Sequence, residues 1–210
     1  MPTIGLVEIV HPDRVYRLLY DRTRMNVDKF VLLSSGVQQE IITEDTEIIK
    51  VPEWPESGES KDYPMATWFN DAAKRLDTDI LIFWNQDFVS HSGFLEEITY
   101  KCKPRTRLCT TWNDIKEDKF ISKGRPNPPK TTGNEDNWSM VIWRQDFIDL
   151  GGFDERLPFF GHDINLNLRM KKAGFDKQVL SHCYWHLSHD RDYRKLEDRN
   201  HYLKLAHELV

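Results

Sequence analysis

Short apolar runs alternate with segments of helical spacing through the first part of the chain, where Ile4–Val10 is the first run and ends at His11-Pro12-Asp13. The predicted strands are residues 4–10, 30–33, 47–51 and 79–84, and the predicted helices are residues 14–25 and 64–76. In the second helix, Ala66, Phe69, Ala73 and Leu76 share one face. The last strand is continuously apolar, which is typical of a strand covered on both faces. The pattern therefore predicts an α/β domain with a mostly parallel, Rossmann-like sheet flanked by helices.

A glycine-rich segment marks the second half. It contains Gly151-Gly152-Phe153-Asp154-Glu155 and Gly161-His162-Asp163, followed by an apolar segment with Arg169. Glycines mark sharp turns or close approaches, and a helix N-terminus favours negative charge. We therefore expect Asp163 to be an ionised carboxylate at the rim of a cleft. Residues 190–210 show roughly helical spacing and predict a docked tail helix.

Residues 123–137 are rich in proline, glycine, lysine and asparagine and predict a long loop. Loops of this length are often functional, so a mobile substrate lid and a plain surface loop are both open interpretations.

Composition narrows the function classes. A chain of 210 residues fits one domain, and its formal charge of −5 gives no strong nucleic-acid signal. The local basic run Lys101, Lys103, Arg105 and Arg107 is either a solvated helix end or a patch for acceptor or phosphate. The three cysteines lack metal-ligand spacing, which favours a reducing compartment. No stretch approaches the roughly 20 apolar residues of a membrane span, and no signal-peptide pattern opens the chain, so we expect a soluble, cytoplasmic protein.

Polar residues end the strand predicted over 79–84, in the order Asn85-Gln86-Asp87. Ligands of doubly wound sheets bind outside the carboxyl ends of the strands. In an extended segment Asn85 and Asp87 can face one ligand while Gln86 turns aside. The alternative is a strand-end turn in which these side chains satisfy backbone groups.

Together, the segments 70–95 and 140–175 resemble the GT-A glycosyltransferases, in particular the inverting, family 2-like enzymes. The resemblance implies a single GT-A domain over residues 1–189, with a nucleotide-donor half (1–98) and an acceptor half (99–189), followed by the helical tail. It also implies a UDP- or GDP-type nucleotide sugar as donor, Mn²⁺ or Mg²⁺ as cofactor, and an acceptor that the sequence leaves unknown.

On the donor side, Asn85-Gln86-Asp87 corresponds to the family's Asp-x-Asp motif. By resemblance Asp87 binds the metal ion that neutralises the donor diphosphate, and Asn85 bonds to the ribose or to a metal-bound water. Asn70 matches the Asn of the family's Arg-Asn pair, with Phe69 in place of the Arg. The expected donor-binding residues are His11, Asn70, Asn85 and Gln86. His186 best fits the position after the final strand where a His completes the metal site in some relatives, so it is the second candidate metal ligand.

On the acceptor side, Asp163 matches the family's general base, and displacement assisted by a single base predicts inversion. His162 replaces the usual Glu; we expect it to titrate near neutrality and to contact acceptor or phosphate. Trp138 and Phe160 are the aromatic candidates for sugar stacking, with core packing as the alternative. The alternative for Asp163 is that it only caps the following helix.

Two other functions remain open. A catalytically silent sugar- or nucleotide-binding module is suggested by Asn85 and by Ser34, which lies where the family usually has a base-binding Asp. A retaining transferase or nucleotidyltransferase is the other, because a fold does not fix the reaction.

Overall fold

The structure is a computed structural model that describes residues 1–10, 27–34, 46–51, 63–85, 88–90, 93–109, 112–116, 140–181, 184–188 and 198–210. The predicted helix over 14–25 and the predicted loop over 123–137 lie outside these residues. So do four of the candidate site residues, namely His11, Gln86, Asp87 and Trp138.

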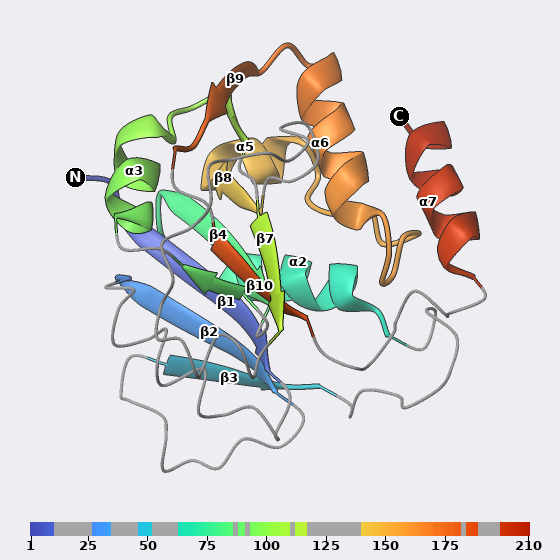
Figure 1. The fold of residues 1–210 in the computed structure, drawn as a ribbon, viewed down its shortest axis with the longest axis horizontal. Helices are drawn as coiled ribbons and strands as arrows, with labels where there is room; N and C mark the ends of the chain where they lie inside the picture. The colour runs from blue at the N-terminus through green and yellow to red at the C-terminus, as the bar shows by residue number, and fades with distance from the viewer. Residues whose placement is uncertain are drawn as a thin grey trace.

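A five-stranded sheet forms the centre of the molecule, with the order β3-β2-β1-β4-β8 (Figure 1). Its strands are β1 (Ile4–Val10), β2 (Lys29–Ser34), β3 (Thr46–Lys50), β4 (Ile80–Asn85) and β8 (Val141–Trp143). Every pairing is parallel except that of β4 with β8. The mostly parallel α/β architecture predicted from the sequence is confirmed, and the strand bounds shift by no more than a residue or so.

The strand order reverses between β1 and β4. From β1 the chain builds outward through β2 to β3, and β4 then pairs with the other side of β1. Such a reversal leaves a crevice at the carboxyl ends of the two strands, which is where ligands bind in open α/β sheets. The first five residues of β4 are all buried, because both faces of the sheet are covered.

Two apolar layers enclose the sheet, and alternate strand residues enter opposite layers. Leu81 and Phe83 pack in the layer with α2 (Met65–Arg75), α5 (Arg144–Asp149) and α6 (His162–Lys172). Ile82 and Trp84 pack in the layer with α3 (Phe94–Lys101). The predicted helix face of Ala66, Phe69, Ala73 and Leu76 belongs entirely to the first layer, which confirms that prediction.

Two small sheets complete the described part. β5 (Phe88–Ser90) and β7 (Trp112–Lys116) flank β10 (Tyr184–Ser188), and β6 (Thr106–Cys109) pairs with β9 (Asp176–Val179). The basic run lies at the end of α3 and in β6. Arg107 is buried and donates to Asn167 Oδ1 at 3.0 Å, and the Arg105 guanidinium lies 4.9 Å from the Phe175 ring centre. These arginines therefore stabilise the fold.

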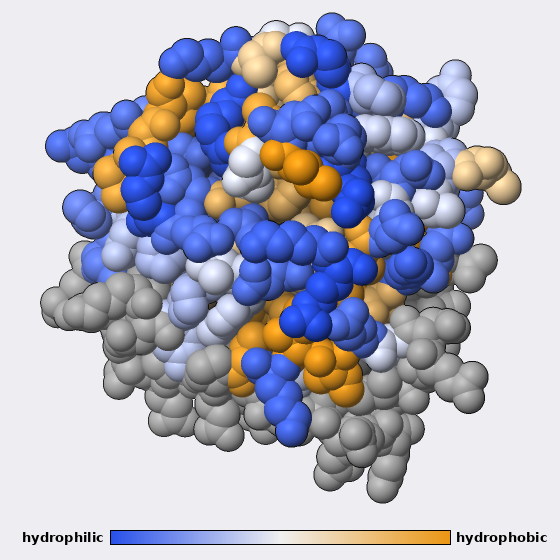
Figure 2. All heavy atoms as spheres, turned by 180° about the vertical axis from the view of Figure 1, so that it is seen from behind, coloured by the Kyte–Doolittle hydropathy of each residue, from blue (hydrophilic) through white to orange (hydrophobic). Residues whose placement is uncertain are grey.

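The last helix, α7 (Arg199–Glu208), lies within the predicted tail and packs beside α6 at the edge of the molecule (Figure 1). Seen from behind, the coloured surface is mostly hydrophilic, with apolar side chains in small separate patches (Figure 2). Within the described ranges, no helix combines the length and apolar character needed to cross a membrane. Cys102 and Cys109 are both buried free thiols.

Candidate active site

Asn85 is the last residue of β4 and lies in register with Ile9, so it occupies the carboxyl edge where the strand order reverses. Its Oδ1 atom is buried and has no hydrogen-bond partner among the described residues. A buried acceptor left without a partner costs about 1–3 kcal/mol, so an atom of this kind is suited to receive a donor group or a cation from a ligand. His11 directly follows β1 in the sequence, and its own placement lies outside the described part.

The backbone pairs His186 with Phe88, which directly follows the Asn85-Gln86-Asp87 segment in the sequence. In the antiparallel pair of β5 and β10, His186 lies opposite Phe88, the residue directly after Asp87. Opposite residues of such a pair have Cα atoms about 4.5–5.5 Å apart. On the other side His186 is in register with Asp114 of β7, an acidic residue that the sequence pattern did not single out. This register supports the predicted metal pair without testing it.

The side chains of Asp87 and His186 lie outside the described part of the chain. Among the side chains inside it, no three His, Cys, Asp or Glu groups gather where they could hold a metal ion. The fit of a divalent ion therefore depends on Asn85, whose buried amide oxygen is the hard type of ligand that Mg²⁺ and Mn²⁺ accept.

Asp163 lies in the first turn of α6 and is partly exposed. The N-cap of this helix is Gly161, which adopts φ = +82° and has no side chain to cap with. Asp163 is therefore not the N-cap residue, because the helix begins one residue before it, and a purely structural role in the first turn stays the alternative. The positive end of the helix dipole favours the ionised carboxylate at this position.

His162 is buried at 5% exposure between two aromatic rings, with ring centres 6.1 Å from Phe69 and 5.0 Å from Phe153. Burial lowers the pKa of His162 from its ordinary value, although Asp163 and a hydrogen bond with the Phe159 backbone oppose this shift. The imidazole is thus neutral at pH 7, and the expectation that it titrates near neutrality is wrong. Its contact with an acceptor stays a prediction.

A stack of rings connects β4, which ends at Asn85, to the helix of Asp163. The Phe83 ring of β4 lies 4.8 Å from Phe153, and Phe153 in turn contacts His162, which precedes Asp163. Asn85 follows Phe83 by two residues and so projects to the same face of β4. The two ends of the candidate site are therefore connected through the packed core.

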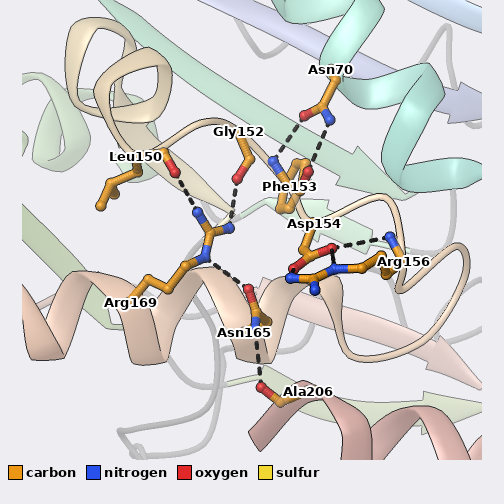
Figure 3. A network of polar contacts seen from close by, with 9 residues as sticks. All are labelled: Asn70, Leu150, Gly152, Phe153, Asp154, Arg156, Asn165, Arg169 and Ala206. Atoms are coloured by element: carbon orange, nitrogen blue, oxygen red, sulfur yellow. Dashed lines mark hydrogen bonds and ion pairs between the residues drawn. The ribbon is translucent and has the colours of Figure 1, made fainter. Parts of the chain in front are cut away.

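Asn70 holds the turn that leads toward Asp163 (Figure 3). Its Oδ1 accepts a hydrogen bond from Phe153 N at 2.8 Å, and its Nδ2 donates to Phe153 O at 2.9 Å and to Glu155 Oε1 at 3.0 Å. Asn70 thus stabilises the turn that contains Phe153. The sequence did not indicate this function, because the partner lies 83 residues away. Donor binding by Asn70 stays a prediction.

Arg169 holds the same turn from α6 (Figure 3). Its guanidinium donates to Leu150 O and to Gly152 O, both at 2.6 Å, and to Asn165 Oδ1 at 2.7 Å. Nearby, the Arg156 guanidinium hydrogen-bonds both carboxylate oxygens of Asp154 and lowers the pKa of that carboxyl. The turn over residues 150–156 is therefore fixed by polar contacts at both of its ends.

Phe160 is half-buried and packs edge-to-face on Phe159 at 4.8 Å. The guanidinium of Arg199, at the start of α7, lies 6.0 Å from its ring centre. Phe160 is therefore available at the surface beside α7, and its predicted contact with an acceptor sugar remains untested.

No protein-family model matches this sequence, and no curated protein sequence matches it either. Solved structures do match. S. aureus TarS superposes with a TM-score of 0.63 at 12% identity, over 97% of this chain and 39% of that one. GalNAc-T7, crystallised with UDP, GalNAc and Mn²⁺, gives 0.58 at 12% identity, over 90% of this chain and 44% of that one. The chain has a GT-A fold.

A second structure, S. aureus TarS 1-349, gives a TM-score of 0.58 at 11% identity, over 88% of this chain and 60% of that one. At such identities the likeness shows the fold alone. The chain spans between 39% and 60% of the length of these structures. The GT-A fold accounts for the placement of Asn85 at the strand reversal and of Asp163 on a helix of the opposite half.

Proposed function

We propose that this chain is a metal-dependent glycosyltransferase that moves a sugar from a nucleotide diphosphate sugar to an acceptor hydroxyl with inversion. One observation supports the proposal. In a GT-A fold, a packed row of rings, Phe83, Phe153 and His162, connects two candidate groups. These are the buried, unpartnered oxygen of Asn85 and the carboxylate of Asp163 at the start of α6.

The donor nucleotide and diphosphate would occupy the carboxyl edge between β1 and β4. Asp87 and His186, the latter paired with Phe88 next to Asp87, would hold a Mn²⁺ or Mg²⁺ ion, with Asn85 on the ribose or on a metal-bound water; the ion's charge would offset that of the diphosphate leaving group. GalNAc-T7 was crystallised with UDP, GalNAc and Mn²⁺, which supports this ligand class for the shared fold. Whether the nucleotide is of UDP or GDP type is open.

Asp163 would accept the proton of the acceptor hydroxyl as its oxygen attacks the anomeric carbon. The new bond joins the acceptor oxygen to that carbon, and the bond from the carbon to the diphosphate oxygen breaks with its electron pair on the diphosphate. Attack from the face opposite the leaving group inverts the anomeric centre. Burial lowers the pKa of His162 and so disfavours a positive charge on the imidazole beside Asp163.

Replacing Asp163 by Asn tests the proposal, because the amide is nearly isosteric with the carboxylate and cannot take up the proton. We expect Asp163→Asn to retain its fold and its affinity for the nucleotide diphosphate, and to lose transfer by roughly a hundredfold or more. Asp149→Asn, at the exposed end of α5, is a matched control and should transfer at the wild-type rate. Transfer by Asp163→Asn at a near wild-type rate would place the base elsewhere, and a product with retained configuration would contradict inversion.

A second candidate function is a silent nucleotide- or sugar-binding module, favoured by the neutral Asn85 in place of an acidic ligand and by Ser34 at the end of β2. Binding of nucleotide sugar without any transfer or hydrolysis by the wild-type protein, in the presence of Mn²⁺, would favour this module over the enzyme.

A further inference from the structure

Helix α7 approaches the N-terminus of α6 so closely that only glycine fits at the contact. A Cβ atom at Gly161 would lie 2.9 Å from Ala206 Cβ and 3.0 Å from Tyr202 O. Gly161 also has φ = +82°, a conformation that other residues rarely adopt. Ala206 is fully buried in this contact, whereas the rest of α7 is partly or fully exposed. The tightest approach of α7 is therefore at the start of α6, next to Asp163.

Asn165 connects this contact to the acceptor-side turn. The side chain is fully buried; its Nδ2 donates to Ala206 O of α7 at 3.0 Å, and its Oδ1 accepts from Arg169 Nε. The remaining guanidinium nitrogens of Arg169 hold Leu150 O and Gly152 O. Figure 3 shows these bonds as one continuous path from α7 through α6 to the turn.

The backbone places Asn165 within the turn of helix that carries Asp163. Asn165 N donates to Gly161 O at 2.8 Å, and this bond closes the first turn of α6 around residue 163. A movement of Asn165 or of Gly161 therefore moves the carboxylate. Misplacing a catalytic group by about 1 Å can cost roughly a hundredfold in rate.

We propose that Asn165 is a positioning residue for Asp163 and that α7 is the element through which it acts. The inference rests on the proposed function, in which Asp163 is the base. In this arrangement α7 fixes the first turn of α6 from outside, while Arg169 and Asn70 fix the turn that precedes it. The C-terminal helix is thus part of the acceptor half of the site.

Asn165→Asp separates the two contacts of this side chain. The carboxylate still accepts from Arg169 Nε, but an oxygen now faces Ala206 O where an N–H donated. We expect kcat to fall at least tenfold while KM for the nucleotide sugar stays within twofold, because the donor edge of the sheet is unchanged. Lys172→Ala removes an exposed bond from the end of α6 to Val210 O, just beyond α7, and should leave kcat within twofold.

A second pair of variants loosens α7 without touching α6. Ala206→Gly and Lys204→Gly both introduce glycine into the same helix and lower its propensity alike. Only Ala206 faces Gly161, whereas Lys204 is exposed. We expect kcat to fall several-fold for Ala206→Gly and to stay within twofold of wild type for Lys204→Gly. This pair also decides the matter if Asn165→Asp does not fold.

Equal kcat values for Ala206→Gly and Lys204→Gly would overturn the proposal, as would a folded Asn165→Asp with wild-type kcat. Hydrogen exchange gives a readout that needs no activity. The Asn165 amide should exchange faster in Ala206→Gly than in Lys204→Gly, because its bond to Gly161 O depends on α7. Unequal exchange with no sugar transfer by the wild-type protein would leave the coupling supported and refute the proposed function instead. Equal exchange at Asn165 would overturn the coupling itself.

Discussion

The two adjacent glycines at the start of the acceptor-side turn give a matched test of the Asn70 clamp. Both adopt positive φ, +81° at Gly151 and +73° at Gly152. A Cβ at Gly151 would meet nothing within 4 Å, whereas a Cβ at Gly152 would lie 2.6 Å from Asn70 Oδ1. Gly151→Ala therefore adds only backbone strain, and Gly152→Ala adds the same strain and displaces the Asn70 amide.

The difference between the two variants can be worked from the contacts. The left-handed conformation costs alanine about 1–2 kcal/mol at either position. Displacing Asn70 also leaves the N–H and C=O of Phe153, a residue 2% exposed, without the partners that Asn70 supplies. Each of these two buried groups costs about 1–3 kcal/mol, so Gly152→Ala should be less stable than Gly151→Ala by about 2–6 kcal/mol.

Urea unfolding measures the two free energies, and Asn70→Ala completes a double-mutant cycle. Without the amide there is nothing for a new Cβ to displace, so Gly152→Ala should cost no more than Gly151→Ala in that background. The coupling free energy should equal that difference, about 2–6 kcal/mol, for Gly152 with Asn70 and be near zero for Gly151 with Asn70. Equal stabilities of the two glycine variants, or additive costs at Gly152 and Asn70, would refute the clamp.

Two further predictions concern the metal ion and pH. Asp87→Ala should strongly weaken Mn²⁺-dependent binding of a nucleotide diphosphate in calorimetry, because the diphosphate then lacks charge neutralisation; unchanged affinity would contradict the metal assignment. Because the folded-state pKa of His162 is lowered below the unfolded value of 6.5, the unfolded state takes up a proton first as the pH falls. The contribution of the neutral His162 to the stability of the folded state is therefore complete above pH 6.5 and is lost as pH falls below it. The loss should reach up to about 1.4 kcal/mol between pH 7.5 and 5.5 and be absent in His162→Gln but present in His207→Gln, an exposed control; an unchanged pH slope in His162→Gln would contradict burial of the neutral imidazole.

The first half of the fold was predictable because its signals are local. The strands around β1 and β4 are apolar runs with polar ends, and the face of α2 repeats at helical spacing, so periodicity alone identifies them. The small strands β5, β6 and β9 were not identified. Each has only three or four residues, too few for a period to appear, and they form only when partners distant in the sequence supply the ladder.

The residues of the candidate site also divide into those with a local signal in the sequence and those without one. Asn85 and Asp163 were predictable because each lies at the end of a strand or the start of a helix, where a polar residue stands out from an apolar pattern. The function of Asn70 and the path through Asn165 were not predictable, because an asparagine on a helix reads as an ordinary polar residue until its partners across 83 and 41 positions are known. The burial of His162 was missed for a related reason: the aromatic rings around it come from α2 and from the turn over residues 150–156.

The packing of the core explains how a neutral Asn85 and a distant Asp163 can belong to one site. A transferase must fix the distance between the anomeric carbon of its donor and the base that activates its acceptor, since both partners react only in a narrow geometry. Here the span is set by the close-packed rings of Phe83, Phe153 and His162, which connect β4 to the start of α6. Asn70 bonds the backbone of Phe153 and Arg169 bonds the adjacent Gly152 O, each from a different helix, so the rings cannot slide without breaking these hydrogen bonds. In the proposed function, a rigid span of this kind would position both halves before substrate arrives, and the geometry of the site would then depend on residues that touch neither donor nor acceptor.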